Sequence, residues 1–102
     1  MRRGEVWWGE TPNHGRRPYL VLTRDHAIGV LNEILVAVVT RTIRDIDTHV
    51  ALDQTDGMPE PCAANFDNLI MMPQSHLTGR ITSLSPARME EVCAALSAAV
   101  DC

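Results

Sequence analysis

The octapeptide "EILVAVVT" at residues 33–40 is the strongest strand signal in this 102-residue sequence. Nearly all of its residues are apolar or β-branched, and β-branched residues favour the extended backbone of a sheet. A short apolar run with polar segments beside it is typical of a strand that is buried on both faces. We therefore expect residues 33–40 to form a strand inside the core.

Shorter segments rich in strand formers occur on both sides of this run, separated by clusters of turn-forming residues. The predicted strands are residues 4–10, 18–24, 48–53, 79–84 and a segment that begins at Cys62 and ends near Leu69 or Ile70. The predicted loops are residues 11–15, 25–33, 41–47 and 54–61, and the second of these has room for a short helical turn.

One clear helix is expected, after the last strand. Ser85 can cap its first turn, and Pro86 suits the first helical position. The apolar residues that recur at helical spacing are Met89, Val92, Cys93, Leu96 and Val100, and we expect this stripe to pack on the sheet. Several short strands followed by a terminal helix predict a mainly β fold, a small curled antiparallel barrel, in a single domain spanning residues 1–102.

Charge is distributed unevenly along the chain. The net charge of −4 argues against a general nucleic-acid binder. Residues 1–44 carry seven arginines and four acids, a net +3, whereas residues 45–102 carry two arginines and nine acids, a net −7. All nine basic residues are arginines, which suits bidentate phosphate recognition but also follows from a GC-rich genome.

The composition points to a cytoplasmic protein without a membrane span. No run of about 18 apolar residues is present, and the N-terminal segment does not have the pattern of a signal peptide. The three cysteines, Cys62, Cys93 and Cys102, have no metal-type spacing, and the four histidines are scattered. We expect reduced thiols, no metal site and no cofactor.

Two arginines precede a proline and an apolar run in "GRRPYLVLT" at residues 15–23. Arg17 begins the strand predicted here, and Thr40 ends the strand predicted at residues 33–40. If these strands are antiparallel neighbours, a guanidinium and a hydroxyl meet at one rim of the sheet and can hold a phosphate. The alternative is a solvated basic loop beside a threonine that serves only the strand.

Other candidate binding residues lie near this rim or in a later strand. Asn13, His14 and Arg16 belong to the adjoining loop, where His14 is either a titratable base or an idle surface residue. Trp7 and Trp8 could stack on bases, although one of two adjacent strand residues must face inward. Asp67 and Asn68 could read the edges of unpaired bases or could form a turn.

Five segments in order resemble the MazF/PemK family of toxin endoribonucleases. They are "RRGEVWWGE" (2–10), "RRPYLVLT" (16–23), "LVAVVT" (35–40), "FDNL" (66–69) and "ITSLSPARMEEV" (81–92). The order of these segments is more specific than any one of them. The resemblance implies an SH3-like barrel of the CcdB/PemK type, a homodimer, and metal-independent, sequence-specific cleavage of single-stranded RNA.

The same resemblance assigns roles to individual residues. It implies that Arg17 holds the scissile phosphate and stabilises developing charge, with the option of donating a proton, and that Thr40 fixes the phosphate by hydrogen bonding. The RNA-binding residues it implies are Asn13, His14, Arg16, Arg41, Thr42, Asp67 and Asn68. The first loop is shorter than in many members and lacks their carboxylate, so the general base stays open, with His14 as one candidate.

The resemblance also implies a cognate antitoxin that inserts an acidic, extended tail into the RNA groove, where it competes with phosphate for the arginines. A second expectation remains beside the nuclease, namely a gyrase-poisoning toxin of the CcdB type with the same barrel. Such poisoning depends on apolar and aromatic residues late in the terminal helix, and the segment "SAAVDC" at residues 97–102 has no tryptophan.

Overall fold

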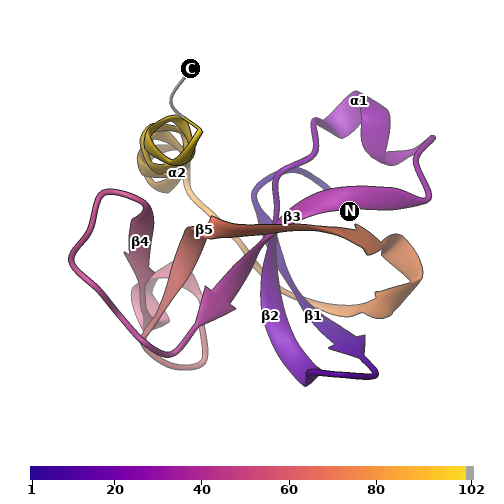
Figure 1. Cartoon of the computed structure of the whole chain (residues 1–102), viewed down its shortest axis with the longest axis horizontal. Helices are drawn as coiled ribbons and strands as arrows, with labels where there is room; N and C mark the ends of the chain where they lie inside the picture. Colours follow the sequence, from indigo (N-terminus) through magenta and orange to yellow (C-terminus); the bar gives the residue numbers. More distant parts are fainter. Residues whose placement is uncertain (101–102) are drawn as a thin grey trace.

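Six antiparallel strands form one curled sheet in the order β4-β5-β3-β2-β1-β6, and a helix covers one side of it (Figure 1). The computed structural model describes residues 1–100. The elements are β1 (Glu5–Thr11), β2 (Gly15–Val21), α1 (Asp25–Ile28), β3 (Glu33–Thr40), β4 (His49–Leu52), η1 (Gln54–Asp56), β5 (Cys62–Pro73), η2 (Gln74–His76), β6 (Leu77–Ser83) and α2 (Pro86–Ala99). The expected mainly β fold with a terminal helix is confirmed.

Strand β3 has the predicted bounds and is buried on both faces. Its side chains alternate between two hydrophobic cores, as the period of a strand requires. Val36 and Val38 belong to the core that contains Tyr19. Ala37 and Val39 belong to the other core, which lies under α2. The apolar run is therefore continuous because each face of β3 has its own core.

Strand β2 starts earlier than predicted, and Arg17 lies within it rather than at its start. The register of β1 and β2 continues to the pair Thr11 and Gly15, so the loop between them is only a tight turn. Gly15 has φ +62°, a conformation that glycine adopts without steric cost. Pro18 is tolerated inside the strand because the pairing of β2 with β3 begins only at Tyr19.

Strand β5 runs to Pro73, three residues or more beyond the predicted end. Ala37 of β3 pairs with Leu69, whereas the next residue, Val38, pairs with Asn65. Residues 66–68 are therefore extra on β5, and a bulge of this kind bends a strand and increases its twist. The bend lets one long strand take part in both halves of the curled sheet (Figure 1).

Helix α2 has the predicted cap, since the side chain of Ser85 accepts the N–H of Arg88 at 3.2 Å. The predicted apolar stripe is wrong at Cys93 and Val100, which are both exposed. Alanines contact the core in their place, and the contacting residues are Met89, Val92, Ala95, Leu96 and Ala99. The fully buried residues of α2 are Val92 and Ala95, so the buried face does not include Cys93.

Candidate functional site

Arg17 and Thr40 lie on neighbouring antiparallel strands at the same end of the sheet. The last described pair of β2 and β3 is Tyr19 with Val38. Continuing this register by two residues on each strand places Arg17 opposite Thr40, on the face that also carries Tyr19. Burial raises the pKa of Tyr19, and the nearby charge of Arg17 opposes that shift. Arg17 and Tyr19 therefore lie on the same face of β2.

A cavity of about 330 Å³, here called the arginine cavity, contains both Arg17 and Thr40. Its lining includes three arginines, one carboxylate and several apolar side chains. The lining residues are Trp8, Arg16, Arg17, Pro18, Val39, Thr40, Arg41, Met58, Pro59, Glu60 and Cys62. The sequence predicted the meeting of Arg17 with Thr40, and the structure brings Arg16 and Arg41 to the same place.

The arginines of this cavity differ in what holds them. The guanidinium of Arg16 lies over the ring of Trp8, 4.3 Å from its centroid, in a cation–π contact. Arg41 forms an ion pair with Glu60, with 2.6 Å between Nε and Oε1. Among residues 1–100, no carboxylate forms an ion pair with Arg16 or Arg17. Arg16 and Arg17 thus line the cavity without a carboxylate in ion-pair contact among residues 1–100.

The hydroxyl of Thr40 is oriented by the chain that follows it. Its oxygen accepts the backbone N–H of Thr42 at 3.2 Å. Since a hydroxyl has one donor and two acceptor positions, this contact leaves the hydroxyl hydrogen of Thr40 available to a ligand. Arg17 and Thr40 together offer a charged donor and a neutral donor to an anion.

The two adjacent tryptophans have different surroundings. Trp7 packs against the core that contains Tyr19, and its indole N–H donates to Glu5 at 3.0 Å. Trp8 lines the arginine cavity. The expectation that one of the pair faces inward is confirmed, and Trp8 is the ring that a ligand can reach.

A second cavity, of about 390 Å³ and here called the β5 cavity, shares Thr40 with the first. Its lining residues are Thr40, Thr42, Arg44, Ile46, His49, Asn65 and Asp67. The carboxylate of Asp67 accepts the hydroxyl of Thr48 at 2.6 Å, and the backbone N–H of Asp67 donates to the side chain of Asn65 at 2.9 Å. A carboxylate and an amide with free hydrogen-bonding positions therefore adjoin the arginine cavity.

Three of the predicted binding residues lie outside both cavities. Asn13 and His14 are exposed at the turn between β1 and β2, and Asn68 is exposed on the bulge of β5. The amide that shares the β5 cavity with Asp67 is Asn65, not Asn68. The bulge explains this difference, because it changes which residues of β5 face β3.

The sequence pattern indicated a binding role for neither Glu60 nor His49. His49 lines the β5 cavity, and its buried Nδ1 has no hydrogen-bond partner within residues 1–100. Glu60 lies in the segment "MPEP", which was expected only as a loop. The two prolines around it are the one local signal of a fixed conformation.

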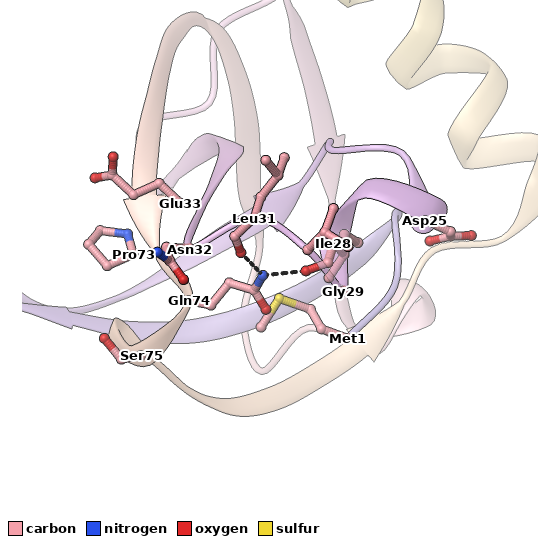
Figure 2. Close-up of a pocket in the computed structure, with 11 residues that line it drawn as sticks. Met1, Asp25, Ile28, Gly29, Leu31, Asn32, Glu33, Pro73, Gln74 and Ser75 are labelled. Carbon is pink, nitrogen blue, oxygen red and sulfur yellow. Dashed lines mark hydrogen bonds between the residues drawn. The ribbon is translucent and has the colours of Figure 1, made fainter.

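A third cavity, of about 1040 Å³ and here called the α1 cavity, lies at the other end of β3 beside α1 (Figure 2). The amide of Gln74 closes it by donating to the carbonyls of Ile28 and Leu31, at 2.6 and 2.7 Å. Its ionisable side chains are Asp25 and Glu33, and no arginine lines it. The charged side chains of this cavity are therefore acidic, unlike those of the arginine cavity.

The described thiols and the other metal-binding side chain types do not gather into a further site within residues 1–100. Cys62 is buried and Cys93 is exposed, both as free thiols, and Cys102 lies outside the described residues. Within residues 1–100, no three or more histidine, cysteine or acidic side chains gather as a metal site. Nor does that part of the chain contain a helix long and apolar enough to cross a membrane.

Comparison with known proteins gives a family and named relatives. Residues 2–100 match the family described as "PemK-like, MazF-like toxin of type II toxin-antitoxin system". The chain is 42% identical over 103 residues to the probable endoribonuclease MazF2 of Mycobacterium tuberculosis, covering all of both chains. It is 44% identical over 101 residues to the probable endoribonuclease MazF5 of that organism, covering 98% of this chain and 93% of the relative.

Solved structures agree with the fold. The toxin MazF-mt6 of Mycobacterium tuberculosis has a TM-score of 0.87 at 27% identity, covering 95% of this chain and 96% of that one. A mycobacterial endoribonuclease in complex with its cognate antitoxin has a TM-score of 0.89 at 24% identity, covering 99% and 95%. These matches support the first of the two expected functions and give no support to the CcdB-type alternative. The chain belongs to the PemK-like, MazF-like toxins of type II toxin–antitoxin systems.

Proposed function

We propose that this toxin is a metal-independent endoribonuclease that cleaves single-stranded RNA at the phosphate held between Arg17 and Thr40. The observation that carries the proposal is the arginine cavity, which Arg17 and Thr40 line together with Arg16 and Arg41. Two of the three guanidiniums there have no carboxylate in ion-pair contact within residues 1–100. An anion with several oxygens fits such a site, and a phosphodiester is one.

The reaction is an attack by a ribose 2′-OH on the adjacent phosphorus. The 2′-oxygen bonds to phosphorus, the bond to the 5′-oxygen breaks, and the products are a 2′,3′-cyclic phosphate and a 5′-hydroxyl. Extra negative charge develops on the phosphate oxygens in the transition state. Arg17 stabilises this charge, and Thr40 donates a hydrogen bond to the same phosphate, an effect that commonly contributes about 2–4 kcal/mol per donor.

The surrounding side chains bind the RNA on either side of this phosphate. Trp8 offers a ring for stacking a base while Arg16, stacked on that ring, reaches the backbone. Asp67 and Asn65 present an acceptor and a donor to an unpaired base in the β5 cavity. Arg41 lines the arginine cavity, and Thr42 lines the β5 cavity. RNA that extends past these cavities contacts Asn13, His14 and Asn68.

The cognate antitoxin competes for the same arginines. An extended tail rich in aspartate and glutamate would place its carboxylates where the phosphates of RNA bind, since both are anions that arginine holds through two hydrogen bonds. We place the protein in the cytoplasm, where such RNA is available, as a homodimer.

The test uses purified protein and a long single-stranded RNA in buffer with EDTA. We expect discrete fragments that carry 5′-hydroxyl and 2′,3′-cyclic phosphate ends. A 2′-deoxy substitution at the cleaved position should abolish the cut there, because the nucleophile is gone. Intact RNA, or cleavage that occurs only after a divalent metal is added, would contradict the proposal. Mapping the fragment ends would also reveal the recognised sequence.

A further inference from the structure

The loop between β4 and β5, residues 53–61, is firmly attached to the rest of the fold. Asp53 and Asp56 cap the short helix η1 reciprocally. Arg88 of α2 donates to Asp56 at 2.8 Å, and the hydroxyl of Thr82 on β6 donates to the carbonyl of Asp56 at 2.8 Å. Gly57 has φ +91°, and a Cβ there would collide with Thr82. The loop is thus held by both a strand and a helix.

This attachment brings Glu60 to the arginine cavity in a restricted conformation. Pro59 fixes its own backbone angle, and Pro61 restricts the backbone of Glu60 before it. The carboxylate is half exposed and contacts Arg41 through Oε1, 2.6 Å from Nε. Oε2 is the oxygen left to accept a proton from a ligand in the cavity.

Glu60 is also the one carboxylate among the residues that line this cavity. The arginines keep their protons throughout the usual pH range. Burial, together with the charges of Glu60, Asp56 and Asp53, raises the pKa of the Cys62 thiol to about 11, so the thiol is already protonated. His14 lies outside the lining of the cavity. The other charged residues that line the cavity are Arg41, which pairs with Glu60, and Arg16 and Arg17.

We propose that Glu60 is the general base of the RNA cleavage reaction, an inference that rests on the proposed function. The 2′-O–H bond breaks and its proton passes to Oε2 of Glu60 as the 2′-oxygen bonds to phosphorus. The bond from phosphorus to the 5′-oxygen then breaks, and that oxygen takes a proton from solvent. Arg41 keeps the carboxylate directed into the cavity and acts as a positioning residue toward it.

A carboxylate beside a phosphate site is unfavourable for RNA binding, and a role as general base would explain its presence. Its negative charge repels the phosphate and weakens RNA binding, and a glutamine in its place would avoid this cost. The carboxylate therefore has opposite effects on the two steps of the reaction. It opposes RNA binding and favours the cleavage step. Its removal should therefore lower kcat without weakening the binding of RNA.

The experiment compares Glu60→Gln with the wild-type protein and with Glu33→Gln as a matched control. Glu33 is an exposed glutamate at the other end of β3, about 23 Å from Thr40 along an eight-residue strand. We expect Glu60→Gln to lower kcat by about 100-fold or more, the range for loss of a general base. Binding of a 2′-deoxy RNA analogue should be unchanged or tighter, and Glu33→Gln should match the wild type in both.

Two further readouts separate a base from a merely structural carboxylate. The wild-type rate should fall on the acid side of its pH profile, and Glu60→Gln should lose that limb. An RNA with a 5′-thio leaving group needs no acid, so Glu60→Gln should stay slow on it. Wild-type rates for Glu60→Gln, a retained acid limb, or loss of the limb only in Asp67→Asn would overturn the assignment of Glu60.

The outcomes also distinguish this inference from the proposed function. If the wild-type protein leaves RNA intact, the proposed function fails, and the assignment of Glu60 falls with it. If the wild type cleaves RNA and Arg17→Ala does not, while Glu60→Gln cleaves at full rate, only the general base is wrong.

Discussion

At Thr40, strand β3 ends beside a cavity rimmed by three arginines, whereas at Glu33 it begins beside a cavity whose ionisable side chains are acids. The strand between them is apolar, and all of its residues except the partly buried Leu35 are buried. The difference comes from what adjoins each end. The β1–β2 hairpin and the loop before β5 meet the first, and α1 and η2 meet the second. In this toxin the barrel supplies the frame, and the segments at one strand end supply the chemistry.

The largest expected effect on RNA cleavage comes from replacing an arginine at the Thr40 end of β3. An arginine near the other end serves as the comparison. Arg17→Ala should lower kcat/KM for RNA cleavage by about 1000-fold or more, because it removes a charged donor aimed at the transition state. Arg24→Ala, near α1, should leave cleavage unchanged, since Arg24 contacts only the neighbouring His26 through its side chain among the described groups. Arg17→Lys should recover little, because an ammonium cannot hold two phosphate oxygens as a guanidinium does.

Equal cleavage rates of the Arg17→Ala and Arg24→Ala variants would contradict the proposed difference between the two ends of β3. The measurement is the initial rate on a fluorescent single-stranded RNA, with folding checked by circular dichroism. Equal losses at Arg17 and Arg24 would mean that general positive charge, and not the arginine cavity, accounts for activity.

A smaller effect is expected at Thr40, whose neutral hydroxyl makes a weaker hydrogen bond than a guanidinium. Thr40→Ala should lower kcat by about 30- to 1000-fold, which corresponds to about 2–4 kcal/mol. Thr40→Ser should restore part of the rate, because it returns the hydroxyl without the methyl group. The thermal unfolding temperature should change little, since Thr40 is only partly buried at the end of its strand. Full activity of Thr40→Ala would remove this hydroxyl from the site.

The smallest effect on catalysis is expected at the opposite end. Gln74→Ala removes two hydrogen bonds to the carbonyls of Ile28 and Leu31 and should reduce the free energy of unfolding by about 1–2 kcal/mol (Figure 2). The cleavage rate per folded molecule should stay at the wild-type value. Ser75→Ala, a neighbouring exposed residue of the same cavity, is the control for stability. A loss of rate without a loss of stability would show that the α1 cavity takes part in RNA cleavage.

The sequence predicted the features that depend on local pattern. The apolar run at residues 33–40 predicted a doubly buried strand, and Ser85 with Pro86 predicted the start of α2. The expected antiparallel pairing of the two strands then placed Arg17 near Thr40, although β2 begins three residues earlier than expected. That start depends on pairing with β1 through Gly15, which no propensity of the arginines or the proline indicates.

Features that depend on contacts between distant segments could not be predicted. The bulge at residues 66–68 arises where β5 must pair with β3 along two different registers, and it exchanges Asn65 for Asn68 in the β5 cavity. Glu60 reaches the arginine cavity because its loop is fixed by Thr82 and Arg88, which lie far along the chain. Cys93 and Val100 have helical spacing, but the direction in which α2 crosses the sheet decides which side chains are buried.

The most direct test of the account is a crystal structure of the protein with a single-stranded RNA that carries a 2′-deoxy nucleotide at the cleaved position. We predict one phosphate in the arginine cavity, with its oxygens within hydrogen-bonding distance of both the Arg17 guanidinium and the Thr40 hydroxyl. RNA bound elsewhere on the sheet, with Arg17 and Thr40 in contact with no phosphate, would contradict it.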